Sequence, residues 1–191
     1  MLFAPPEKIN SQTGLCFDAI YKESPNKNDR PLNTPIDLLV FHNISLPPGC
    51  YGGPWITDLF LNRLDPAAHP YFEEIADNPV SAHVLIRRSG EVLQYVPFHE
   101  RAWHAGRSNY CGREACNDFS IGIEFEGDDF HPFTVKQYLA AQTLVAALID
   151  CYPDVSADRI VGHSDIAPGR KTDPGPYFNW AYFRAGLLDI V

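Results

Sequence analysis

The chain has 191 residues, a length typical of one domain with a single core, and its formal net charge is −9. That charge disfavours partners that are themselves anionic, such as a nucleic-acid backbone or a membrane surface. No apolar run approaches the ~20 residues of a membrane span either, so we expect no binding to nucleic acid or membrane, and a monomer whose partner is small and locally recognised.

The N-terminal part, residues 1–32, is rich in Pro, Asn, Lys and Ser, which predicts an irregular arm packed on the domain with a short strand at 15–20. Residues 1–9 lack the basic region and long apolar stretch of a secretory signal. The five cysteines are an odd set without a CxxC pair, which favours free thiols in a reducing compartment, although Cys111 and Cys116 could pair. We therefore expect a cytoplasmic protein.

The rest of the chain, residues 33–191, is expected to form one α/β domain. Its apolar patterns predict strands at 36–42, 82–87, 91–96, 121–126 and 159–162. Gly90 supplies the positive φ of a tight turn, so the second and third of these strands form a hairpin. Helical spacing predicts helices at 55–63, 68–76, 134–150 and 178–188. Thr134 and Gln137 form a capping-box pattern at the third helix. This order of elements predicts a central mixed β-sheet flanked by helices.

A loop near the C-terminus combines metal-ligand side chains. His163 and Asp173 are ten residues apart in a segment stiffened by prolines, and His42 at the end of a buried strand is the best candidate for a third ligand. A catalytic zinc uses three such protein ligands and leaves a fourth position for water. Alternatively, the loop His and Asp merely pair with each other or with backbone. Lys171 stands two residues before Asp173, so an extended chain would direct both side chains toward one cavity. The alternative is that Lys171 is a surface lysine with a mobile ammonium.

Amide hydrolysis at zinc also requires a base that moves the proton of the attacking water. On the strand at 121–126, period two places Glu124 and Glu126 on one face, so both carboxylates compete for this role. The alternative role for Glu126 is a solvated or salt-bridged carboxylate at the strand end.

Several segments resemble a known family. They are FHNISLPPG at 41–49, VSAH at 80–83, RAWHAG at 101–106, CNDFSIGIE at 116–124 and GHSDIAPGRKTDPG at 162–175. Together they resemble the AmpD-type 1,6-anhydro-N-acetylmuramoyl-L-alanine amidases, which share their fold with peptidoglycan recognition proteins. The likeness runs from about residue 24 to the last helix, and Ser164 departs from the Cys that is common in the family.

The resemblance implies roles for the candidate residues. It implies that His42, His163 and Asp173 bind Zn²⁺, that Glu124 is the general acid and base, and that Lys171 stabilises the oxyanion. A second set of residues is expected to contact substrate: Asn43, Trp103 and His104. Trp103 suits a sugar face, and a core position is almost as compatible with the sequence.

The activity that the resemblance implies is hydrolysis of the amide between anhydro-N-acetylmuramic acid and the L-alanine of the stem peptide, in cytoplasmic peptidoglycan recycling. The partner is then a muropeptide. Two other functions make different predictions. A peptidoglycan-fragment binding module would lack a metal ligand, whereas here the three ligands, Glu124 and Lys171 all match. A zinc carboxypeptidase would release D-Ala instead of the intact peptide.

Overall fold

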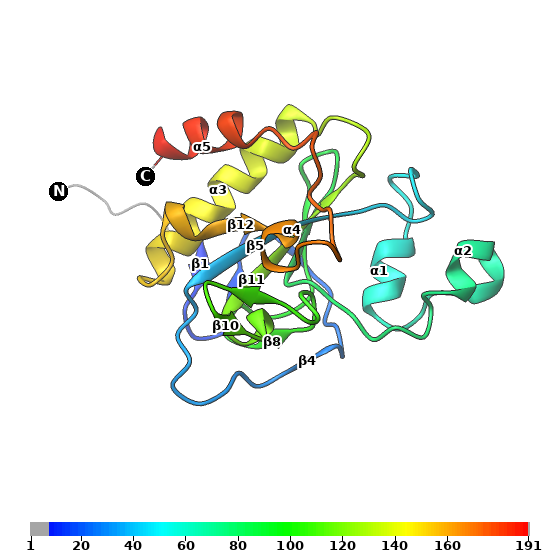
Figure 1. The fold of residues 1–191 in the computed structure, drawn as a ribbon, viewed down its shortest axis with the longest axis horizontal. Coiled ribbons are helices and arrows are strands. Elements are labelled where there is room, and N and C mark those ends of the chain that lie inside the picture. Colours follow the sequence, from blue (N-terminus) through cyan, green and yellow to red (C-terminus); the bar gives the residue numbers. More distant parts are fainter. Residues whose placement is uncertain (1–7, 191) are drawn as a thin grey trace.

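A six-stranded mixed sheet forms the centre of the molecule (Figure 1). The computed structural model describes residues 8–190, and its sheet has the strand order β12-β5-β11-β6-β7-β3. The first four strands in this order are parallel, and β7 runs antiparallel to β6. The strands are β3 (Ile20–Tyr21), β5 (Leu38–Ile44), β6 (Val84–Ile86), β7 (Val92–Gln94), β11 (Ser120–Glu126) and β12 (Ile160–Gly162). The predicted α/β class with a mixed sheet is confirmed.

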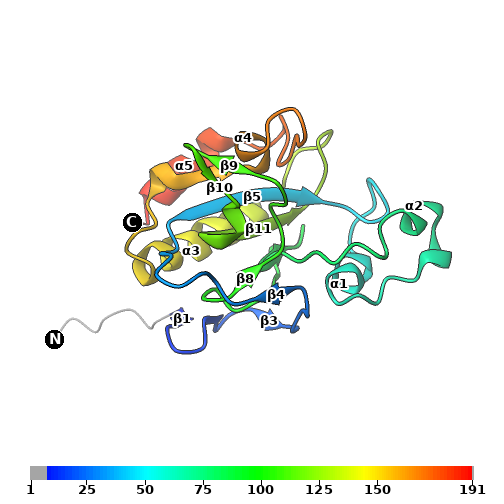
Figure 2. The same cartoon turned by 60° about the horizontal axis from the view of Figure 1, so that its bottom comes forward.

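The helices lie in two places around this sheet. The long helices α3 (Val135–Cys151) and α5 (Trp180–Leu188) pack together over one face, while α1 (Trp55–Phe60) and α2 (Pro70–Glu73) lie beyond the end of β5 (Figures 1 and 2). The short α4 (His163–Ile166) follows β12 directly. Single-turn 3-10 helices are η1 (Pro66–Ala68), η2 (Cys116–Asp118) and η3 (Ala157–Arg159). No helix within residues 8–190 is long and apolar enough to cross a bilayer.

The remaining strands form three two-stranded ladders. They are β1 (Ile9–Asn10) with β2 (Leu15–Cys16), β4 (Lys27–Asn28) with β8 (Arg101–Ala102), and β9 (Asn109–Tyr110) with β10 (Arg113–Glu114). The single strand predicted at 15–20 is therefore split into β2 and β3. Because β3 pairs with β7 and β4 with β8, the N-terminal region is hydrogen-bonded to the rest of the fold. The domain boundary after residue 32 stays a prediction, and the expectation about a secretory signal concerns residues that lie largely outside the described part.

The predicted helix at 68–76 is wrong in its extent. Pro70 disfavours helical backbone at the residue before it, and His69 is extended, with φ −160° and ψ 140°. The chain therefore makes the separate turn η1 before it and starts α2 at Pro70, where a missing N–H costs nothing. The helix predicted at 55–63 likewise ends early, at Phe60, with Asn62 at a φ of +55°. By contrast, the capping box of Thr134 and Gln137 is confirmed at the start of α3.

Along β5 and β11, successive side chains point to opposite faces of the sheet, so one face packs in the core and the other faces the site. Ile123 and Phe125 of β11 pack with Phe41 of β5 against the helices α3 and α5. Phe41 stacks on Trp180 with ring centroids 5.5 Å apart. The opposite face of β5 carries Leu38 and Val40, which belong to a second buried cluster. The next residue along that face is His42. Because the strand is buried and held in the sheet, the position of this imidazole is fixed.

Candidate metal centre

Three ligand-type side chains converge at the C-terminal ends of β5 and β12. His42 lies on β5, His163 begins α4 immediately after β12, and Asp173 lies in the loop that follows. Their positions are linked because β12 pairs in parallel with β5, with Gly162 opposite Phe41. The Nδ1 atoms of the two histidines are 2.9 Å apart, and each is 3.0 Å from Oδ2 of Asp173. The structure thus brings together the three residues that the sequence analysis selected as metal ligands.

Hydrogen bonds behind His42 determine which of its nitrogens carries the proton. The hydroxyl of Ser120 donates to the carbonyl of Cys116 at 2.5 Å, so its oxygen can accept from Nε2–H of His104 at 3.2 Å. Nδ1 of His104 is then an acceptor, and it lies 3.0 Å from Nε2 of His42. His42 must therefore carry its proton on Nε2, which leaves a lone pair on Nδ1 in the neutral ring.

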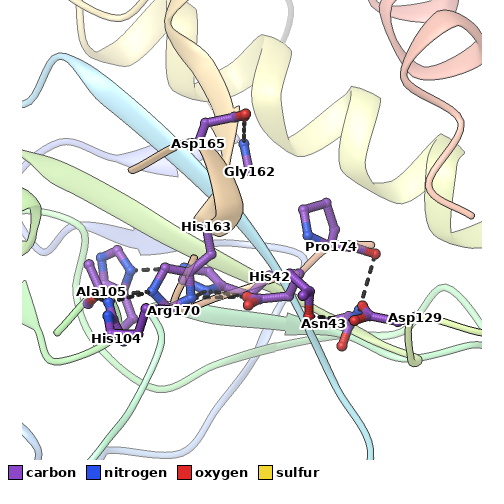
Figure 3. A network of polar contacts seen from close by, with 12 residues as sticks. His42, Asn43, His104, Ala105, Asp129, Gly162, His163, Asp165, Arg170 and Pro174 are labelled. Atoms are coloured by element: carbon purple, nitrogen blue, oxygen red, sulfur yellow. Dashed lines mark hydrogen bonds and ion pairs between the residues drawn. The ribbon is translucent and has the colours of Figure 1, made fainter. Parts of the chain in front are cut away.

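His163 has the same tautomer for a simpler reason. Its Nε2 lies 3.1 Å from the carbonyl oxygen of Ala105, which can only accept a hydrogen bond (Figure 3). Two Nδ1 lone pairs and a carboxylate oxygen therefore face one another at about 3 Å. Such a set is repulsive by itself and fits a cation, because tetrahedral zinc at 2.0–2.2 Å from its ligands spaces them by about 3.3 Å. The cluster is compatible with a metal site.

The protonation of the cluster agrees with this arrangement. Burial lowers the pKa of His42 to about 4, so the imidazole is neutral and able to bind a metal at physiological pH. His42 is therefore present in the form of an imidazole that ligates a metal.

Glu124 lies beside the cluster. It is the register partner of His42 on the neighbouring strand, so both side chains share the site face of the sheet. Burial raises the pKa of Glu124 well above its ordinary value, Asp173 raises it further, and Lys171 opposes the shift. Its Oε2 is buried and has no hydrogen-bond partner among residues 8–190. This carboxyl is thus free to exchange protons with a bound molecule.

Glu126 has a different environment, although it stands on the same strand face. It is buried and forms an ion pair with Arg87, with Oε1 2.9 Å from Nη1. Its carboxylate also accepts hydrogen bonds from the backbone N–H groups of Gly52 at 2.7 Å and Arg88 at 3.1 Å. The salt-bridged role is confirmed, whereas the expectation of a solvated carboxylate is wrong.

A groove of about 530 Å³ opens over the cluster. Glu124, Lys171 and Asp173 line it at one end, and Trp103 lines it as well. The apolar side chains that line the rest include Leu46, Leu59, Phe60 and Val80. The structure therefore places Lys171 and Asp173 at one cavity, as the spacing of the two residues predicts. Lys171 itself is exposed.

The three candidate substrate contacts also line this groove. Nε1–H of Trp103 donates to Oδ1 of Asn28 at 2.7 Å, which holds the indole at the groove instead of in the core. Both ring nitrogens of His104 are engaged by His42 and Ser120. The Nδ2 group of Asn43 donates to Oδ1 of Asp129 at 2.7 Å and to the carbonyl of Pro174 at 3.0 Å. Only the amide oxygen of Asn43 is left for a bound molecule.

Two side chains in this network escaped the sequence analysis. Ser120 orients His104, and its position on the strand could have revealed it, because period two places Ser120 on the same face as Gly122 and Glu124. Asp129 contacts Asn43 and Thr172 from a loop, and no local pattern in the sequence distinguishes it from the neighbouring Asp128.

Comparison with known proteins agrees with the site. A family model described as N-acetylmuramoyl-L-alanine amidase (Amidase_2) matches residues 32–176. The 1,6-anhydro-N-acetylmuramyl-L-alanine amidase AmpD of Escherichia coli K12 is 62% identical over 161 residues, covering 84% of this chain and 87% of that protein. A crystal structure of a selenomethionine AmpD derivative matches with a TM-score of 0.90 at 55% identity, covering 93% of this chain and 98% of that one.

A third relative has been solved with a bound molecule. It is the amidase AmiD from E. coli in complex with the substrate anhydro-N-acetylmuramic acid-L-Ala-D-γ-Glu-L-Lys, with a TM-score of 0.60 and 29% identity. The match covers 83% of this chain and 60% of that one. The fold, the site and these likenesses lead to one conclusion: the chain belongs to the N-acetylmuramoyl-L-alanine amidase family and, within it, to the enzymes of the AmpD type.

Proposed function

We propose that this amidase is zinc-dependent and cleaves the amide between 1,6-anhydro-N-acetylmuramic acid and the L-alanine of the stem peptide. The observation that carries the proposal is the convergence of two imidazole lone pairs and a carboxylate beside Glu124, whose Oε2 is buried. The name of the E. coli relative and the molecule bound to AmiD support the anhydro sugar as part of the substrate.

His42, His163 and Asp173 would hold the zinc, with their outer atoms oriented by His104, Ala105 and the loop around Asp173. Bound zinc would polarise the scissile carbonyl and acidify the attacking water. Because two neutral imidazoles and one carboxylate would not fully neutralise bound Zn²⁺, the site would keep a net positive charge, which favours a developing oxyanion.

Glu124 is proposed as the group that moves the proton. It accepts a proton from the attacking water at its unpartnered Oε2 and delivers that proton to the leaving amide nitrogen. A raised pKa favours this role, because a carboxyl that holds its proton more firmly than usual remains protonated long enough to donate it. Lys171 adds a positive charge at the same end of the groove and stabilises the oxyanion.

The groove suggests how the substrate lies. We place the sugar against Trp103, whose face suits the apolar side of a pyranose ring. The amide oxygen of Asn43 accepts a hydrogen bond from the stem peptide, and His104 contributes to the wall while it orients His42. A rigid anhydro ring loses less conformational entropy on binding than a free reducing sugar, so we propose a preference for anhydromuropeptides. A monomer acting in the cytoplasm on recycled wall fragments fits this substrate.

The metal is tested by elemental analysis of the purified protein. One zinc per chain is expected, with little in His42→Ala and Asp173→Ala, because each removes a ligand. A chain without metal, or an unchanged zinc content in both variants, contradicts the assignment.

The reaction is tested by mass spectrometry of the products from one anhydromuropeptide. The expected products are the anhydro sugar and the intact peptide, formed with a much higher kcat/KM than from the reducing sugar. Release of D-Ala would indicate a carboxypeptidase, and binding without products would indicate a recognition module.

A further inference from the structure

The loop from Lys171 to Gly175 carries two groups of the proposed machinery. Asp173 is a metal ligand and Lys171 faces the groove, with Thr172 between them. The other two ligands belong to β5 and α4, whereas Asp173 lies in a turn outside any helix or strand. Inside the loop, the backbone N–H of Gly175 donates to the carbonyl of Thr172 at 3.0 Å. The position of this loop decides whether the third ligand reaches the site.

Asp129 binds this loop to the end of β5. Its Oδ2 accepts a hydrogen bond from the hydroxyl of Thr172 at 2.5 Å, and its Oδ1 accepts from Nδ2 of Asn43 at 2.7 Å. The same Nδ2 donates to the carbonyl of Pro174 at 3.0 Å, so Asn43, Asp129 and Pro174 form one connected group (Figure 3). Asn43 is the residue after His42, and therefore the network joins the strand of one ligand to the loop of another.

The packing around Gly175 confirms close contact between the two loops. A Cβ at this position would lie 2.3 Å from Oδ1 of Asp129 and 2.9 Å from its Cα. Gly175 also has a φ of +82°, which a side chain rarely adopts. The Lys171–Gly175 loop thus lies directly on Asp129, without space for a side chain at position 175.

We propose that Asp129 is a positioning residue that places Asp173 and Lys171 for metal binding and catalysis. The inference rests on the proposed zinc-dependent function. Asp129 contacts neither the ligand atoms nor the groove, and it acts through the hydroxyl of Thr172 and the amide of Asn43. Outer hydrogen-bond partners of this kind typically change metal affinity or activity by about 10- to 100-fold when removed.

The adjacent carboxylate offers a matched control. Oδ2 of Asp128 accepts from the hydroxyl of Tyr51 at 2.6 Å, and its carboxylate also contacts Nδ1 of His131 at 2.9 Å. These contacts connect it to the segment around Tyr51 and not to the Lys171–Gly175 loop. Asp128→Ala therefore removes a charge and the contacts with Tyr51, His131 and the backbone N–H of Phe130, while Asn43 and Thr172, the hydrogen-bond partners of Asp129, stay in place.

The first experiment measures zinc affinity by competition with a chelator, after circular dichroism has shown that each variant is folded. Asp129→Ala is expected to raise the zinc Kd by about 10- to 100-fold, and Asp128→Ala by less than about threefold. Thr172→Val removes only the hydroxyl and should weaken binding in the same direction. Because the two side chains share one hydrogen bond, which Asp129→Ala already removes, the double variant should bind zinc no more weakly than Asp129→Ala alone.

The second experiment separates positioning from general stability. With cobalt in place of zinc, Asp129→Ala should alter the visible absorption spectrum, because the geometry of the Asp173 ligand changes. On an anhydromuropeptide its kcat should fall while KM changes little, and Asp129→Asn should recover much of the loss, since its amide can still bond to Asn43 and Thr172. If Asp129→Ala does not fold, Thr172→Val provides the same readouts.

The outcomes distinguish the inference from the proposed function. A lower melting temperature with unchanged zinc Kd and cobalt spectrum in Asp129→Ala and Thr172→Val would show a purely structural role and overturn the inference alone. A wild-type chain that binds no zinc would overturn both. Weaker zinc binding in both variants, with Asp128→Ala near wild type, supports the positioning role.

Discussion

At the scale of single residues, Glu124 and Glu126 show how two carboxylates on one strand face acquire different properties. Glu126 is neutralised by Arg87 and two backbone N–H groups, so its charge is fully compensated. Glu124 has an oxygen without a hydrogen-bond partner among residues 8–190, and burial beside the cluster of His42, His163 and Asp173 raises its pKa. A buried carboxyl without a partner is costly for stability, and such groups concentrate at functional sites.

Glu124→Gln is therefore expected to retain zinc and to lose about 10²- to 10⁴-fold in turnover, because an amide cannot accept the proton of water. Zinc content and kcat on an anhydromuropeptide measure the two effects separately. Glu126→Gln is the control, and it should lower the free energy of unfolding through its broken ion pair while the folded enzyme keeps its turnover. The reverse pattern, with Glu126→Gln inactive and Glu124→Gln active, would show that the base is assigned to the wrong carboxylate.

At the scale of elements, strand β11 supports the site through its smallest residue. Gly122 lies between Ser120 and Glu124 on the site face, and a Cβ there would be 2.4 Å from Cγ of His104. The missing side chain leaves the space in which the His104 ring lies and bonds to His42. The strand thus supplies a hydrogen-bonding residue, a gap and a carboxyl at successive positions of one face.

Gly122→Ala should displace the His104 ring, break its hydrogen bond to His42 and lower zinc affinity by about 10-fold or more. The overpacking should also cost roughly 1–3 kcal/mol of stability. Gly112→Ala is a suitable control: its Cβ would meet no atom within 4 Å, but its φ of +86° imposes backbone strain. That variant should lose roughly 1–3 kcal/mol without a change in zinc affinity. Equal zinc affinities in both variants, measured by chelator competition, would argue against the role of the gap.

At the scale of the whole molecule, buried histidines make the free energy of unfolding depend on pH. Burial lowers the pKa of His83 and His104 well below the ordinary value, and that of His42 to about 4. Nδ1 of His83 accepts from the backbone N–H of Gly122 at 3.0 Å, so its Nε2–H donates to the carbonyl of Glu100 at 3.1 Å. The ring is therefore held in its neutral form. As pH falls through about 6.5, the unfolded chain takes up protons that the folded chain does not.

The metal-free protein should consequently be most stable above pH ~6.5 and lose stability below it, by up to about 1.4 kcal/mol per pH unit for each of these histidines. His83→Gln removes one of them, so its free energy of unfolding should fall less steeply between about pH 6 and 5, by up to that amount per unit. Urea titrations of wild type and variant at several pH values measure the slopes. Identical slopes would mean that His83 is protonated in the folded state.

Local patterns were sufficient for much of this protein. Alternation along residues 121–126 predicted which side chains of β11 face the core and which face the site, because a strand has a period of two wherever it lies. The capping box at Thr134 and the turn at Gly90 were predicted for the same reason, since each depends on a few neighbouring residues. The family motifs added the ligand set of His42, His163 and Asp173, which spacing alone left open.

Tertiary structure decided what depends on residues far apart in the chain. The tautomer of His42 follows from His104, Ser120 and Cys116, and the placement of Asp173 follows from Thr172, Asp129 and Asn43. Only the parallel pairing of β5 with β11 and β12 brings these groups within hydrogen-bond distance. Glu124 and Glu126 are alike in sequence, but Glu126 is held in an ion pair with Arg87, whereas Oε2 of Glu124 has no partner among residues 8–190. The sequence by itself thus determined the elements and the candidate ligands, and packing between elements determined their protonation, orientation and roles.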